Sequence, residues 1–201
     1  MALNSKTLQM DFYNIFEAMN NIHSNGDEYL ASNCAKAIAT YVSNGTVITT
    51  DIGTGSVTGS TYTGVGQGTM TINSEMLKNL LLTTFKLKSV NPILASNIAM
   101  NIDSVCKVPN IIKTDTVGSS VIPPSSPYVD KGKGLGNFTS VSTLISTRLT
   151  SCFSQMNNMK KNGNLYLSQE WANAIDTYFK SAVINVTLQS PMIGNGVGKI
   201  T

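Results

Sequence analysis

Apolar residues recur at helical spacing in three pairs of segments along the chain. In each segment they follow one another at intervals of three or four residues, which places them on one face of a helix. The first pair carries Leu8, Phe12, Ile15, Phe16 and Met19, then Leu30, Cys34, Ile38 and Tyr41. The last pair carries Ile145, Leu149, Cys152, Phe153 and Met156, then Leu167, Trp171, Ile175 and Tyr178. Each pair is predicted to form an antiparallel helical hairpin.

The ends of the first hairpin carry recognisable signals. Ser5 is expected to cap the first helix, and Gly26 is expected to supply the positive φ at the turn between the helices. β-Branched residues then predict a short strand at 46–50, and the next residues, 53–63, are expected to be a loop or an irregular arm. Short strands are also expected at 108–113 and 182–188.

A glycine motif of the form Gly-x-Gly-x-Gly-x-apolar-Thr occurs three times. Its glycines are Gly64, Gly66, Gly68, Gly132, Gly134, Gly136, Gly194, Gly196 and Gly198. In an extended chain alternate side chains face opposite sides, so three alternate glycines leave one side bare. Bare backbone permits close approach of another backbone. We therefore expect each motif to form an extended interaction arm, anchored on the core by Met70, Phe138 or Ile200.

The similarity between the units extends beyond the glycines. About half of the positions in 19–41 are identical to those in 156–178, and 30–57 aligns with 94–121. The second alignment matches Asp51 with Asp115. Three tandem units follow, at about 1–70, 71–138 and 139–201, packed as one domain. The predicted fold class is mainly α with short β, each unit being a helical hairpin, a short strand and a glycine-rich extended arm.

The composition favours a protein of an assembly over a free enzyme. Only 12% of residues are charged, which is about half of the usual fraction. The single arginine, Arg148, argues against sequence-specific nucleic-acid binding. The first residues lack the apolar run of a signal peptide, and no stretch has the length of a membrane span. The odd number of cysteines, without a Cys-x-x-Cys pair, favours buried reduced thiols.

The residues offer little material for catalysis or for metal binding. His23 is the only histidine and is expected to face solvent at a helix end. Asp51 and Asp115 are expected to be acids of strand-end turns. We therefore predict no enzymatic activity, catalytic residue, metal site, cofactor or small-molecule substrate.

The helix pair followed by a Thr/Gly-rich arm resembles segments of virion structural proteins of tailed bacteriophages. The motifs at 64–71, 132–139 and 194–201 carry this resemblance, together with the Ser/Thr/Asn-rich composition. The resemblance implies a non-enzymatic component of a virus particle, and our leading hypothesis places it in the tail, baseplate or neck. Its expected partners are other virion proteins and further copies of itself, and its expected location is the virion, assembled in the host cytoplasm.

Several alternatives remain open from the sequence. The chain could decorate a capsid, or its glycine loops could bind a phosphate ligand. The three units could close around a threefold pseudo-axis or run in a line. Under the arm hypothesis, three similar units present three similar docking surfaces. Valine at Gly66, Gly134 and Gly196 should then impair assembly more than it unfolds the helices.

Overall fold

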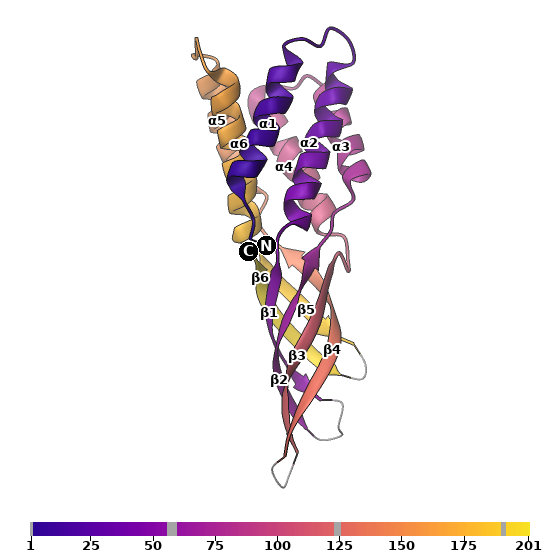
Figure 1. Cartoon of the computed structure of the whole chain (residues 1–201). Helices are drawn as coiled ribbons and strands as arrows, with labels where there is room; N and C mark the ends of the chain where they lie inside the picture. The colour runs from indigo at the N-terminus through magenta and orange to yellow at the C-terminus, as the bar shows by residue number, and fades with distance from the viewer. Residues whose placement is uncertain (1, 56–59, 123–125, 190–191) are drawn as a thin grey trace.

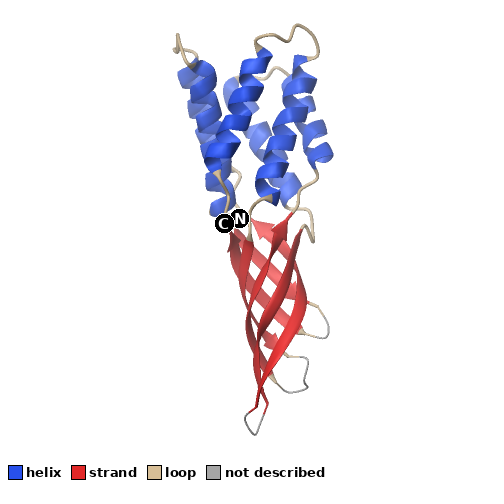
Figure 2. Cartoon of the chain, viewed as in Figure 1, coloured by secondary structure: helices blue, strands red, loops and turns tan. Residues whose placement is uncertain are grey.

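The computed structural model describes residues 2–55, 60–122, 126–189 and 192–201. The molecule is elongated, with the helices gathered at one end and the strands at the other (Figure 1). Both chain ends lie at the junction between these two parts. Figure 2 shows that all helices lie on one side of this junction and all strands on the other.

Two helices and two strands alternate three times along the described residues. The helices are α1 (Ser5–Met19), α2 (Gly26–Ser43), α3 (Ser74–Lys86), α4 (Asn91–Cys106), α5 (Thr143–Met156) and α6 (Gly163–Lys180). The strands are β1 (Val47–Thr54), β2 (Thr61–Met70), β3 (Ile112–Ile122), β4 (Ser126–Thr139), β5 (Val183–Leu188) and β6 (Ile193–Ile200).

The predicted fold class is wrong. The strands form a closed antiparallel barrel in the order β1 to β6, with β6 paired to β1. The segments expected to be glycine-rich arms are the second strands of three β-hairpins, and β4 is 14 residues long. Local patterns missed these strands because glycine has low strand propensity and leaves no alternation of apolar side chains. Pairing with β1, β3 and β5 holds them extended.

The closure of the barrel shows how the three units are arranged. Each strand pairs with its neighbour in the chain, and the last strand returns to the first. The helices follow the same order, since α1 packs on α6 as well as on α2. The units therefore close around an axis that runs along the molecule.

Hydrogen bonds join the second helices of different units. The Tyr41 hydroxyl of α2 donates to Oδ1 of Asp176 on α6 over 2.5 Å. The Tyr178 hydroxyl of α6 donates to Oδ1 of Asp103 on α4 over 2.7 Å. Tyr41 and Tyr178 occupy matching positions of the repeat. Equivalent tyrosine–aspartate hydrogen bonds therefore join α2 to α6 and α6 to α4.

The helix starts differ in detail from the prediction. Asn4, not Ser5, caps α1, and its side chain accepts hydrogen bonds from the amides of Lys6 and Thr7. The left-handed residue between α1 and α2 is Asn25, with φ of 57°, and Gly26 begins the helix. Asparagine tolerates this conformation better than other residues with a Cβ atom.

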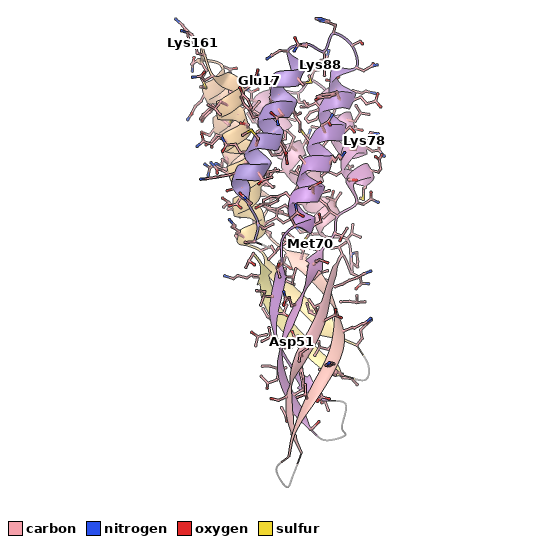
Figure 3. The ribbon with its side chains drawn as sticks, viewed as in Figure 1. Glu17, Asp51, Met70, Lys78, Lys88 and Lys161 are labelled. Carbon is pink, nitrogen blue, oxygen red and sulfur yellow. The ribbon has the colours of Figure 1, made fainter. Side chains whose placement is uncertain are left out.

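Large apolar side chains fill the junction between the helices and the barrel. Met70, Phe138 and Ile200 are all buried, which confirms that the residue after each glycine run anchors its strand on the core. Phe138 packs its ring against Tyr178 and Phe179 of α6, with ring centroids 5.4 Å apart in both pairs. Met70 is marked at this level in Figure 3. The core is thus continuous from the bundle into the barrel.

Candidate functional site

The nine glycines of the repeated motif lie in β2, β4 and β6, three in each strand. Each of these strands is hydrogen-bonded to a neighbour on both sides. Adding a strand from a partner protein requires a free edge. The barrel has none along its described strands, so the expected interaction arms are not free to add a strand to a partner in the folded chain.

The glycines make the barrel narrow. A Cβ atom at Gly66 would lie 2.3 Å from Oγ1 of Thr49, and one at Gly134 would lie 2.2 Å from Cγ1 of Val186. The interior beside Gly66 and Gly134 is therefore lined by side chains of the other three strands. These are Val47, Thr49 and Asp51 of β1, Ile112, Thr114 and Thr116 of β3, and Ile184, Val186 and Leu188 of β5.

The interior changes from apolar to polar along the barrel. Val47, Ile112 and Ile184 stand at matching positions, opposite Gly68, Gly136 and Gly198, next to the helical bundle. Two residues further from the bundle stand Thr49, Thr114 and Val186, and two further again Asp51, Thr116 and Leu188. Figure 3 shows Asp51 about midway along the barrel.

Asp51 is a buried carboxylate with few partners. It has no exposed surface, and its Oδ2 accepts a hydrogen bond of 2.7 Å from Oγ1 of Thr116. Its Oδ1 has no hydrogen-bond partner, and the same holds for Oγ1 of Thr49 and Oγ1 of Thr114. Buried polar atoms in proteins nearly always have a partner, so this cluster requires an explanation.

The register of the strands separates the two aspartates that the sequence alignment matched. Asp51 points into the barrel, whereas Asp115 lies on the outer wall and is exposed. By their place in the barrel, Asp115 corresponds to Thr50 and Asp51 to Thr116. A shift of one residue moves a side chain to the other face of a sheet. The prediction that both are acids of strand-end turns is therefore wrong.

Further from the bundle the interior contains Tyr62 and a second buried carboxylate, Asp130. Burial raises the pKa of Tyr62 to about 12, and the negative charges of Asp51 and then Asp130 contribute to this rise. The Tyr62 hydroxyl has no hydrogen-bond partner. The negative charges of both carboxylates thus disfavour ionisation of the Tyr62 phenol.

The geometry does not suit phosphate binding by the glycines. Their strands pair along both edges, and no helix N-terminus adjoins the middle of the described barrel. On the outer wall, Lys131 and Lys133 line a groove of about 450 Å³, but Asp115 lies in the same groove. The carboxylate of Asp115 would repel an anion in this groove.

The other candidate residues are dispersed. His23 is exposed beyond the end of α1, as predicted. The three cysteines are buried and unpaired, as predicted. In the part of the chain that the structure describes, no three His, Cys, Asp or Glu side chains lie close enough to share a metal ion. The described helices include none with the length and apolarity needed to cross a membrane.

We expect the three cysteines to react slowly with a thiol reagent at pH 7 in the folded protein. Burial raises the pKa of all three thiols, that of Cys152 to about 11, so little of the reactive thiolate is present. Titration with a chromogenic disulfide, before and after unfolding in guanidinium chloride, measures the difference. Rapid labelling of three thiols without denaturant would contradict this burial.

The outer wall of the barrel is apolar on one side. Thr50 of β1 pairs with Val65 of β2 and with Val197 of β6, and Val65 pairs in turn with Val117 of β3. We define the outer apolar patch as Val65, Val117 and Val197 together with Ile48 and Ile52, the nearest outward-facing apolar residues of β1. Its members and exposed fractions are Ile48 46%, Ile52 59%, Val65 56%, Val117 50% and Val197 56%.

The outer wall does not repeat with the units. The positions that correspond to Val65 in the other hairpins are Lys133 and Asn195, and those that correspond to Ile48 are Lys113 and Asn185. The inward glycines repeat in all three hairpins, whereas the described outer residues differ and do not present the three similar docking surfaces that the repeats suggested.

Comparison of the chain with protein families, with curated proteins and with solved structures found no match.

Proposed function

We propose that the chain is a non-enzymatic structural protein of a tailed-phage particle, in the tail, baseplate or neck region. Its support is the outer apolar patch, together with the motif resemblance and the low content of charge. Five β-branched residues that are each about half exposed lie on adjacent strands β6, β1, β2 and β3. A group of exposed apolar side chains on neighbouring strands, here arranged around Thr50, favours protein–protein contact.

The patch replaces the glycine arms as the proposed docking element. Adjacent strands lie about 4.8 Å apart, so the side chains of Val197, Thr50, Val65 and Val117 form a continuous row across four strands. The β3–β4 side of the barrel carries the charges of Lys113, Asp115, Lys131 and Lys133. A partner subunit that covers the patch would bury apolar surface and leave these charges in solvent.

The slender shape suits insertion between subunits. The barrel tapers away from the bundle and has no free edge along its described strands (Figure 2). A rigid rod of this form can pack its patch against a neighbouring wall while the wider helical end stays outside. Because the outer apolar patch lies on one side of the barrel, we expect one principal partner surface for each copy of the chain.

Mass spectrometry of density-banded particles from the source culture tests the proposal. We expect the chain at a fixed ratio to the major capsid protein, and a low ratio places it in the tail or neck. A copy number close to that of the capsid protein would instead indicate a decoration protein. Absence from particles, with the chain abundant in the lysate, would overturn the proposal.

Replacing Val65 with aspartate should reduce incorporation into particles at least tenfold without unfolding the protein. The side chain points to solvent, so the charge costs little in the free chain but much in an apolar interface. Quantitative mass spectrometry of particles assembled with each variant measures incorporation. Asn137→Asp is the matched control, because it adds the same charge at an exposed outward position of β4. Equal incorporation of the two variants would contradict docking through the patch.

A further inference from the structure

The carboxyl group of Asp51 is buried in the barrel interior, and the described residues give it no positively charged partner. Among the side chains whose burial the structure describes, no Lys, Arg or His is buried. Moving a carboxylate out of water costs several kcal/mol unless a charge or several hydrogen bonds compensate it. Thr116 provides one hydrogen bond to Asp51.

Oxygen atoms converge on the space beside Gly66. The point where a Cβ atom of Gly66 would stand is 2.3 Å from Oγ1 of Thr49, 2.6 Å from Oδ2 of Asp51 and 3.1 Å from Oγ1 of Thr116. Three oxygens from β1 and β3 thus surround one small region of the interior. Because Gly66 has no side chain, the oxygens of Thr49, Asp51 and Thr116 can approach one another there.

Unpartnered oxygens face the same interior. Oδ1 of Asp51 lies 1.7 Å from the point where a Cβ atom of Gly196 would stand, on the opposite side of β1 from Gly66. It has no hydrogen-bond partner, and neither do Oγ1 of Thr49 and Oγ1 of Thr114. One carboxylate and several hydroxyl oxygens, all directed inward, therefore have unused capacity to accept.

We propose that the barrel binds a hard cation at Asp51, with the hydroxyl oxygens of Thr49 and Thr116 as further ligands. Calcium and sodium prefer oxygen ligands of these types, and calcium accepts them in irregular geometry at about 2.3–2.6 Å. The cation compensates the buried charge of Asp51. The protein supplies fewer oxygens than calcium usually takes, so the proposed coordination number is low.

The second carboxylate strengthens the attraction. Asp130 lies further from the bundle, and the phenol of Tyr62 experiences the charges of both carboxylates. Their potentials add along the interior, where the low dielectric constant enlarges electrostatic effects. The site thus differs from a metal centre built from three or more His, Cys, Asp or Glu ligands, because threonine hydroxyls supply part of its oxygens.

Thermal unfolding after cation removal tests this site in the intact chain. The protein is treated with a chelator and dialysed into choline chloride, and circular dichroism then records Tm with added calcium or sodium chloride. We expect one of the two to raise Tm by about 5 °C or more at a concentration on the order of 100 times its Kd. Metal analysis of the cation-loaded protein should find about one ion for each chain.

Two aspartates provide a matched pair of variants. Asp115→Asn removes an exposed carboxylate from the outer wall and should retain the full response to the cation. Asp51→Asn should lose the response, and in choline chloride it should unfold at a higher temperature than the wild-type protein, because it removes a buried uncompensated charge. If Asp51→Asn does not fold, Thr49→Val keeps the carboxylate and should raise the half-saturating concentration at least tenfold.

Three results would overturn the proposal. The first is a Tm of the wild-type protein that does not change with calcium or sodium, together with no bound ion in the metal analysis. The second is an equal loss of response in Asp115→Asn and Asp51→Asn. The third is an unchanged half-saturating concentration in Thr49→Val. None of these results bears on incorporation into particles, which is tested through the outer apolar patch.

Discussion

Replacing Gly68 with alanine is expected to lower the free energy of unfolding by about 3 kcal/mol or more. The new Cβ atom would stand 1.8 Å from the carbonyl oxygen of Lys113 on β3. That oxygen belongs to the backbone of a paired strand, so it cannot turn away as the end of a side chain can. Relief requires β2 and β3 to separate, which breaks hydrogen bonds of the barrel. Urea unfolding followed by circular dichroism measures the change.

The same reasoning applies in another unit and has an internal control. At Gly198 the added atom would stand 1.9 Å from the carbonyl oxygen of Ile48, so Gly198→Ala should cost a similar amount. At Gly163, in the first turn of α6, the nearest atom would be Cε of Met156 at 3.6 Å. Gly163→Ala should therefore stabilise the protein by about 0.5 kcal/mol, mainly by restricting the unfolded chain.

These glycine variants test whether the motif serves the close packing of strands in the barrel or the docking of partners. If Gly68→Ala and Gly163→Ala unfold at the same urea concentration, β2 does not approach β3 as closely as described. The sequence-based expectation for valine at Gly66, Gly134 and Gly196 changes for the same reason. Those side chains would enter the filled interior, so we now expect them to disrupt the barrel before any effect on docking.

Trp171→Ala should destabilise the protein by about 4 kcal/mol, which is typical of removing a buried aromatic side chain. Trp171 of α6 is buried and meets two rings of α1 edge to face, Phe12 at 5.4 Å and Phe16 at 5.7 Å between ring centroids. These contacts join the first and last units of the chain. The substitution therefore opens a cavity where the ring of helices closes.

Far-UV circular dichroism is the appropriate measurement for this variant, because Trp171 is the only tryptophan and its fluorescence is lost. Trp171→Phe keeps an aromatic ring and should cost less than half as much. Met10→Ala serves as the control on α1, since Met10 is 59% exposed and should change stability by less than about 0.5 kcal/mol. A loss for Trp171→Ala no larger than that for Met10→Ala would show that the α1–α6 contact contributes little.

The helices were largely predictable from local sequence. Spacing alone predicts Phe12 and Trp171 on apolar helix faces, and both are buried. A helix satisfies its backbone hydrogen bonds within one segment, so its signal is contained in that segment. The exact starts were less predictable, because Asn4 and Ser5 are both good caps and neighbouring contacts decide between them.

The strands and the candidate site were predicted much less well. A strand completes its hydrogen bonds with another segment, and the partner of β1 that closes the barrel lies at 193–200, far along the chain. Nothing local to Gly64 or Gly196 indicates pairing along both edges. The polar interior was missed for the same reason, since Asp51 and Asp115 look alike in sequence and only the register places one inside and the other outside.

The sequence by itself determined the threefold repetition, the six amphipathic helices that the structure describes, and the anchoring of each glycine run by Met70, Phe138 or Ile200. These features depend on short-range periodicity and on the chemistry of single residues. Only the tertiary structure decided that the units form a ring, that the glycines line a narrow barrel, and that Asp51 is enclosed among threonines. Those features depend on contacts between residues distant in the chain, whose geometry is fixed only when the last strand pairs with the first.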